Sequence, residues 1–145
     1  KKMKYSNDIE IVQFSAGCDH AAFLDRNGNV YVLGANNFGE LGSEDDEIVY
    51  SMTLISVLPK IRRVCCGYSH TIGVSEENNR LFIVGYNGEN CLGCPNEGTK
   101  GTFYELSAVG EVENVYSGGN HTIVTDSGDD LWIFGMNTLG QLGLG

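Results

Sequence analysis

The stretch Gly34-Ala-Asn-Asn-Phe-Gly-Glu-Leu-Gly42 decides the architecture, because closely similar stretches occur twice more in the chain. The copies are Gly85-Tyr-Asn-Gly-Glu-Asn-Cys-Leu-Gly93 and Gly135-Met-Asn-Thr-Leu-Gly-Gln-Leu-Gly143. A shorter element precedes each copy, namely Gly17-Cys-Asp-His20, Gly67-Tyr-Ser-His70 and Gly118-Gly-Asn-His121. The histidines are 50 and 51 residues apart, and a fixed period of this length predicts a repeat architecture.

Short apolar runs end at the first glycine of each long element, at Val30–Leu33, Leu81–Val84 and Leu131–Phe134. Runs of this length suit strands that are buried on both faces. More exposed strands are expected upstream, at Ile11–Phe14, Ile61–Val64 and Val112–Val115. A weaker fourth strand is expected near Met52–Val57 and Thr102–Leu106. The pattern therefore predicts an all-β chain of four-stranded units.

The turn residues also repeat. Asn27-Gly28 predicts a two-residue hairpin turn, Ser127-Gly128 occupies the corresponding place in the third copy, and Glu77-Asn78-Asn79 is one residue longer. The asparagine of each long element can turn its side-chain carbonyl onto backbone donors, and Gly or Asn three residues later suits a left-handed position. The side chain of the following leucine is expected to be buried in the core and so to anchor the bend. The residues of this structural signature are Gly17, His20, Gly34, Asn36, Gly39, Leu41, Gly42, Gly67, His70, Gly85, Asn87, Leu92, Gly93, Gly118, His121, Gly135, Asn137, Gly140, Leu142 and Gly143.

The alternation of the two elements resembles the regulator of chromosome condensation repeat, over roughly residues 8 to 145. The resemblance implies a seven-bladed β-propeller of four-stranded blades. It divides the chain into an N-terminal extension (1–7), a first repeat (8–59), a second (60–110) and an incomplete third (111–145). The family often has Trp before the first glycine of the long element, where this chain has Leu33, Val84 and Phe134. We interpret these departures as changes in core packing.

Three repeats cannot close a ring, and open blades would leave apolar faces and strand edges in water. We therefore expect a partial propeller, whose partners include further blades in the same or another chain. The formal charge of −10 disfavours direct binding to nucleic acid, and no apolar run approaches a membrane span. Five cysteines, an odd number, favour a reducing compartment, so a cytoplasmic or nuclear location is expected.

Two groups of residues look like metal or redox sites. The spacing of His20, His70 and His121 places one histidine in each blade, so we predict that each imidazole bonds turn backbone of its own blade and binds no metal. Cys91 and Cys94 have the spacing of a metal knuckle or redox pair. They lack a second pair and a helix N-terminus, so they are interpreted as ordinary reduced thiols.

The densest charge is Glu44-Asp45-Asp46-Glu47, expected in the loop between blades one and two. Four acidic residues in a loop are commonly solvated surface. The functional alternative is an acidic lip that attracts a basic partner segment or a small GTPase. A calcium loop is not expected, because the alternate ligand spacing and the glycine bend are missing.

No catalytic residues and no cofactor are expected, since the sequence pairs no nucleophile with a base and its glycines follow the repeat. The first functional hypothesis is a protein-interaction scaffold, because binding residues concentrate in loops on a rigid frame. The second is guanine-nucleotide exchange on a Ran-like GTPase, an activity that the family resemblance includes. In that family exchange depends on a wedge-like hairpin insertion and acidic contacts. The connections Ser43–Lys60 and Cys94–Glu111 are eighteen residues each and show no insertion, which lowers this hypothesis.

Overall fold

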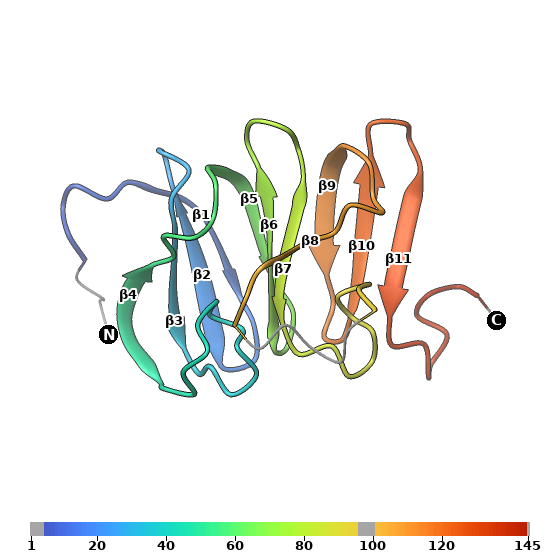
Figure 1. Cartoon of the computed structure of the whole chain (residues 1–145), viewed down its shortest axis with the longest axis horizontal. Helices are drawn as coiled ribbons and strands as arrows, with labels where there is room; N and C mark the ends of the chain where they lie inside the picture. Colours follow the sequence, from blue (N-terminus) through green and yellow to red (C-terminus); the bar gives the residue numbers. More distant parts are fainter. Residues whose placement is uncertain (1–4, 96–100, 145) are drawn as a thin grey trace.

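The computed structural model describes residues 5–95 and 101–144, and it consists of three antiparallel sheets that stand side by side (Figure 1). The first sheet has the order β1(Ile11–Ala16), β2(His20–Asp25), β3(Val30–Gly34) and β4(Val49–Leu54). The second has the order β5(Ile61–Cys66), β6(His70–Ser75), β7(Leu81–Gly85) and β8(Tyr104–Glu105). The third has the order β11(Leu131–Gly135), β10(His121–Asp126) and β9(Val112–Ser117). Within the described ranges there is no helix, and hence none that could cross a membrane.

Each sheet is one blade, and the all-β propeller architecture expected from the repeat is confirmed. The fourth strands differ from expectation. They occupy Val49–Leu54 and Tyr104–Glu105, so the first begins three residues before the predicted Met52 and the second is a two-residue fragment. These strands carry few buried residues, and for that reason their periodicity was a poor guide to their bounds.

The cores lie between neighbouring blades, because each blade packs one face against the next. Between the first and second blades, Ala22, Leu24 and Val32 pack in one cluster with Ile61 and Val64. A second cluster joins the central blade to the third in the same way, from Ile72, Val74, Leu81, Ile83 and Leu92 on one side to Val109, Val112, Val115 and Val124 on the other. The apolar area that stabilises each blade is therefore shared with its neighbour.

The outer faces of the row of blades are open. Leu131 is 60% exposed, whereas Leu81, at the same register position of the central blade, is 1% exposed. At the other side, Phe14 is 72% exposed, whereas its counterpart Val64 is 3% exposed. Equivalent positions are thus buried where a neighbouring blade covers them and exposed where none does.

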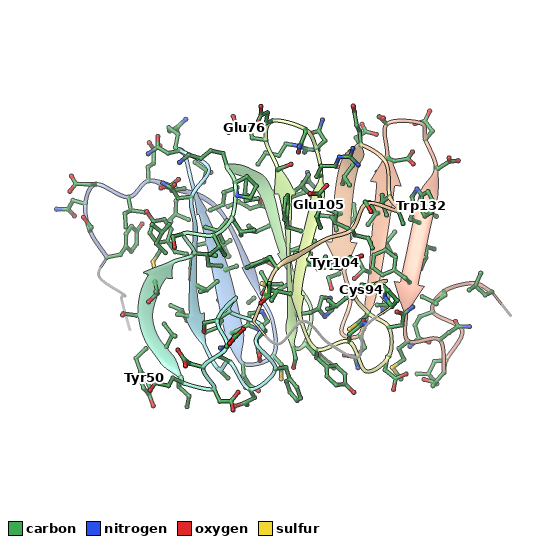
Figure 2. The ribbon with its side chains drawn as sticks, in the orientation of Figure 1. Tyr50, Glu76, Cys94, Tyr104, Glu105 and Trp132 are labelled. Atoms are coloured by element: carbon green, nitrogen blue, oxygen red, sulfur yellow. The ribbon has the colours of Figure 1, made fainter. Side chains whose placement is uncertain are left out.

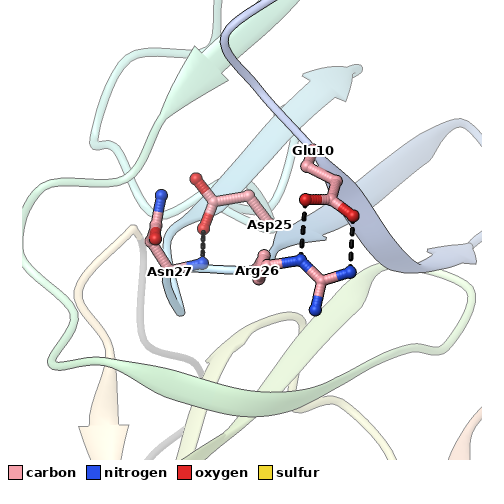
Figure 3. A network of polar contacts seen from close by, with 4 residues as sticks. All are labelled: Glu10, Asp25, Arg26 and Asn27. Carbon is pink, nitrogen blue, oxygen red and sulfur yellow. Dashed lines mark hydrogen bonds and ion pairs between the residues drawn. The ribbon is translucent and has the colours of Figure 1, made fainter.

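The hairpins between the second and third strands are not the expected two-residue turns. Asp25 N donates to Asn29 O at 3.0 Å and Gly28 N donates to Asp25 O at 3.1 Å, which makes a three-residue loop with one left-handed residue, Gly28 (φ 77°). The Asp25 carboxylate accepts from the backbone N–H of Asn27 at 2.9 Å (Figure 3). It also accepts from the backbone N–H of Asn29 at 2.8 Å, and the two bonds hold the wider loop. Arg26 pairs with Glu10 beside it.

The hairpin of the third blade also has a three-residue loop. The left-handed residue there is Asp129 (φ 64°), so the true counterpart of Gly28 is Asp129, and Ser127-Gly128 lies one residue earlier than predicted. In the second blade Asn79 (φ 53°) has this role, within a loop that is one residue longer. Positive φ at Asn and Asp is tolerated better than at most other non-glycine residues, which explains why the position does not always carry Gly.

Candidate protein-interaction surface

The connections between strands gather at two ends of the blades (Figure 1). We call one the hairpin end, formed by residues 26–29, 76–80 and 127–130 together with the connections 55–60 and 106–111. We call the other the loop end, formed by the Gly-x-x-His turns at 17–19, 67–69 and 118–120 and by residues 35–48, 86–95 and 136–144. In Figure 2 Glu76 marks the hairpin end, at the top.

The asparagine bends give the loop end its rigid frame. Asn36 Oδ1 accepts from Leu41 N at 2.8 Å, and its amide Nδ2 donates to Ser43 O at 3.0 Å. The same carbonyl bond joins Asn87 to Leu92 and Asn137 to Leu142, each at 2.9 Å. The three leucines are buried, and the left-handed residues are Gly39, Asn90 and Gly140, with φ of 76°, 56° and 76°. The predicted bond from each asparagine carbonyl to a backbone donor and the predicted burial of the following leucine are both confirmed.

We had predicted that each imidazole bonds turn backbone of its own blade, and for His20 and His70 this prediction is wrong, because both rings bond the next blade. His20 Nε2 lies 2.9 Å from Thr71 Oγ1 of the next blade, and the Thr71 hydroxyl donates to Glu40 O of the first blade at 2.7 Å. His70 likewise lies 2.8 Å from Ser117 Oγ of the third blade. The His20 ring covers Gly17, where an added Cβ would lie 2.3 Å from His20 Cε1, so this position requires glycine.

Burial of the two rings lowers the pKa of His20 and of His70 to about 4 each. Their Nδ1 atoms have no hydrogen-bond partner within the described residues. The Thr71 hydroxyl uses its hydrogen in the bond to Glu40 O, so its oxygen must accept the bond from His20. His20 Nε2 therefore carries the hydrogen. These neutral imidazoles join blades together. No group of metal-ligating residues is found in the part of the chain that the structure describes.

The two cysteines of the Cys-x-x-Cys stretch are buried free thiols. Cys91 Sγ lies 2.8 Å from Tyr86 O, and Cys94 Sγ lies 3.4 Å from Asn87 Nδ2. Burial raises the pKa of Cys91 to about 11, so this sulfur stays protonated at neutral pH. Reactive thiols instead have a lowered pKa and some exposure, and Cys91 has neither.

The acidic group Glu44 to Glu47 is fully on the surface, but its place in the fold differs from expectation. It lies in the connection from β3 to β4 within the first blade, not between blades one and two, because the fourth strand follows it. Asn36 Nδ2 also donates to Asp45 O, at 2.5 Å, which fixes the backbone of the loop while its carboxylates face water.

The charges of the two ends differ. The described cations belong to the hairpin end or to the adjoining half of β5: Arg26, Lys60, Arg62, Arg63 and Arg80. The described ionisable carboxylates of the loop end are Asp19, Glu40, Glu44, Asp45, Asp46, Glu47 and Glu89. Apart from Glu40, these side chains are exposed, and no Lys or Arg lies among the described residues of this end. Among the described residues, no Lys or Arg therefore offsets the negative charge of the loop end.

Models of the "Regulator of chromosome condensation (RCC1) repeat" match residues 27–74 and, separately, residues 11–40. The chain is built from regulator of chromosome condensation repeats. The longer match begins in the hairpin of the first blade and ends within β6 of the second. One regulator of chromosome condensation repeat thus includes the contacts between two blades, among them the bond from Thr71 to Glu40.

Several curated proteins are similar to this chain of regulator of chromosome condensation repeats. The human X-linked retinitis pigmentosa GTPase regulator is 29% identical over 148 residues, which are 99% of this chain and 14% of that protein. The Ultraviolet-B receptor UVR8 of Arabidopsis thaliana is 28% identical over 149 residues, covering 100% of the chain and 34% of the receptor. The human probable E3 ubiquitin-protein ligase HERC4 is 33% identical over 144 residues, covering 94% and 13%. The chain therefore spans about a third or less of each of these relatives.

Solved structures show the same fold. Human WBSCR16 superposes with a TM-score of 0.79 at 24% identity, covering 90% of the chain and 34% of that protein. Yeast RCC1 (Prp20), solved bound to Kap60, superposes with a TM-score of 0.82 at 20% identity, covering 94% and 34%. A further Prp20p structure from Saccharomyces cerevisiae, with a TM-score of 0.78 and 20% identity over 86% of the chain and 32% of that protein, is described with its binding properties to Gsp1p and histones.

Proposed function

We propose that this chain is a protein-interaction module of a propeller, which binds a basic segment of a partner protein at the loop end. The observation that carries the proposal is the segregation of charge: exposed carboxylates at the loop end have no described Lys or Arg beside them. Opposite charge on a partner would steer its approach and select its orientation. The asparagine bends already hold the backbone of these loops, so the loops lose little conformational freedom on binding.

Further propeller blades are the second kind of partner that we propose. The open faces at Phe14 and Leu131 repeat the register positions at which Val64 and Leu81 are covered by a neighbouring blade. A blade of the same family, in this or another chain, has the shape and apolar face to cover them. We further propose a reducing cytoplasmic or nuclear location, supported by the free buried cysteines, and no direct binding to nucleic acid, supported by the charge of −10.

The experiment is affinity capture with the full-length protein as bait, followed by mass spectrometry. A matched bait carries Glu44→Gln, Asp45→Asn, Asp46→Asn and Glu47→Gln, and a control bait carries Glu76→Gln and Glu77→Gln at the hairpin end. The proposal expects a partner with a basic segment that is lost from the first variant and retained by the control. Partners held equally by all three baits would contradict it.

Guanine-nucleotide exchange on a Ran-like GTPase is the second candidate. Two relatives favour it by name: one is a GTPase regulator, and yeast Prp20p is described with its binding to Gsp1p. An acidic loop end is compatible with such a partner. The test is the release of a fluorescent guanine nucleotide from the GTPase in the presence of the full-length protein. Acceleration that disappears on neutralising Glu44 to Glu47 would support exchange, and an unchanged release rate would exclude it.

A further inference from the structure

Three aromatic rings lie within the acidic loop end and come from three different connections. Phe38 precedes the acidic group in the loop from β3 to β4, and its ring centroid is 5.0 Å from that of Tyr86, which follows β7 in the second blade. Tyr86 N donates to Ser69 O at 2.8 Å, which places Tyr86 beside the turn that carries Tyr68. Phe38 and Tyr68 are 46% and 58% exposed. We call Phe38, Tyr68 and Tyr86 the aromatic patch.

The turn that carries Tyr68 is held from both sides. Cys18 N of the first blade donates to Tyr68 O at 3.1 Å, and Tyr68 N donates to Gly119 O of the third blade at 2.8 Å. The Tyr68 ring lies over Gly119, where an added Cβ would be 3.0 Å from Cε2. The backbone of three blades therefore fixes the position of an exposed ring. A rigid, amphipathic aromatic side chain of this kind is a typical anchor of protein interfaces.

Each ring has exposed carboxylates in its own or the adjoining turn. Asp19 follows Cys18, which bonds Tyr68; Glu89 lies three residues after Tyr86; and the acidic group continues the loop of Phe38. Aromatic faces together with carboxylates favour the guanidinium group, which stacks on a ring and donates two parallel hydrogen bonds to a carboxylate. The chain contains an example of the stacking elsewhere, since Arg63 Cζ lies 5.8 Å from the centroid of the Tyr116 ring.

We infer that the aromatic patch receives arginine side chains of an extended segment of the partner protein, with the neighbouring carboxylates pairing their guanidinium groups. This inference rests on the proposed function and adds to it the chemistry of the partner. A lysine segment would satisfy the charge, but an ammonium group lacks the planar surface and the forked donors. The patch therefore discriminates arginine from lysine, which the acidic group alone does not.

The test uses fluorescence anisotropy of a labelled peptide in which arginine alternates with glycine and serine. Matched peptides carry lysine or the neutral isostere citrulline in place of arginine. The full-length protein should bind the arginine peptide more tightly than the lysine peptide, and the citrulline peptide weakest. Phe38→Ala and Tyr68→Ala should each weaken binding of the arginine peptide roughly 3- to 30-fold, the range of one cation–π contact. Tyr68→Phe should retain it.

The control variant is Tyr50→Ala, which removes an exposed tyrosine from the outermost strand of the first blade (Figure 2). Its affinity should equal that of the unaltered protein. Equal affinity for the arginine and lysine peptides, unchanged binding by the Phe38 and Tyr68 variants, or absence of binding would each overturn the inference. If neutralising Glu44 to Glu47 removes the partner while the ring variants retain it, the proposed function stands and the arginine inference fails.

Discussion

His20 reaches across the boundary between the first two blades to Thr71, with 2.9 Å between Nε2 and Oγ1. The Thr71 hydroxyl donates a hydrogen bond to Glu40 O, so one buried threonine connects a turn and a loop of the preceding blade. Thr122 repeats part of the arrangement one blade later, donating to Cys91 O at 2.9 Å. A motif that is read as local in the sequence therefore joins neighbouring blades.

Replacing Thr71 with Val should lower the free energy of unfolding by about 1–3 kcal/mol, because it leaves His20 Nε2 buried without a partner while keeping the shape of the side chain. Chemical denaturation of the full-length protein measures the change. Thr53→Val is the matched control, since Thr53 is exposed and bonds a backbone oxygen in its own strand. A loss no larger than that of the control would show that the bond between the blades contributes nothing.

Acidification should destabilise the blades between about pH 6.5 and pH 4. The folded-state pKa of His20 and of His70 is lowered to about 4 by burial, whereas the unfolded chain has the ordinary value near 6.5. Below pH 6.5 the unfolded state therefore binds more protons, and stability is lost until the folded state also titrates near pH 4. Each imidazole contributes at most roughly 3 kcal/mol to this loss.

Thermal melts of the full-length protein across this pH range, compared with those of a His70→Gln variant, test the assignment to histidine. The variant should have a shallower decline with falling pH, because one of the two buried groups no longer titrates. Identical pH profiles for the two proteins would contradict it.

Leu92→Ala should cost about 2–5 kcal/mol, as expected for a buried leucine that plugs a bend. Leu41→Ala should behave similarly, and Leu142→Ala should cost less because it lies beside the open face of the third blade. Urea denaturation measures these losses, and Leu139→Ala, which truncates an exposed leucine of the third bend, serves as the control. If Leu92→Ala matched that control, the plug would have no role in stability.

Residues 1–145 expressed alone should not form a stable monomer, because the faces at Phe14 and Leu131 are open. If each face exposes about 400 Å² of apolar surface, the loss at ~25 cal/mol per Å² is roughly 10 kcal/mol per face. A typical domain has ~5–15 kcal/mol in total. Analytical ultracentrifugation with a thermal melt should show oligomers or aggregates. A monodisperse 15.7 kDa monomer with one sharp transition would refute this expectation.

The blades and bends could be predicted from the sequence because their causes are local. Asn36 bonds Leu41 only five residues away, and Gly39 is left-handed in the same turn. The partner of His20 lies 51 residues away in the next blade, and periodicity alone could not identify it. The threonine that follows the histidine in two copies was the available signal for this bond. Its hydroxyl reaches the preceding blade only once the blades are packed together.

The interaction surface was only partly predictable for a similar reason. The acidic group was visible as a run of charge, but its place within the first blade depends on where β4 begins. The segregation of cations from the loop end depends on which end each connection occupies. Phe38 and Tyr86 are far apart in the sequence, and their rings meet because the two loops lie at one end of adjacent blades. Tyr68 lies in a neighbouring turn, which Tyr86 N joins through Ser69 O.

The central claim is that a basic partner segment binds at the loop end, and hydrogen–deuterium exchange of the full-length protein, free and bound to its captured partner, tests it most directly. A bound segment slows the exchange of the backbone amides that it covers, so mass spectrometry of the digested protein reports which loops face the partner. We predict slower exchange in the peptides that contain Glu44, Asp45, Asp46 and Glu47. Slower exchange confined to the peptides that contain Glu76 and Glu77 at the hairpin end would contradict the account.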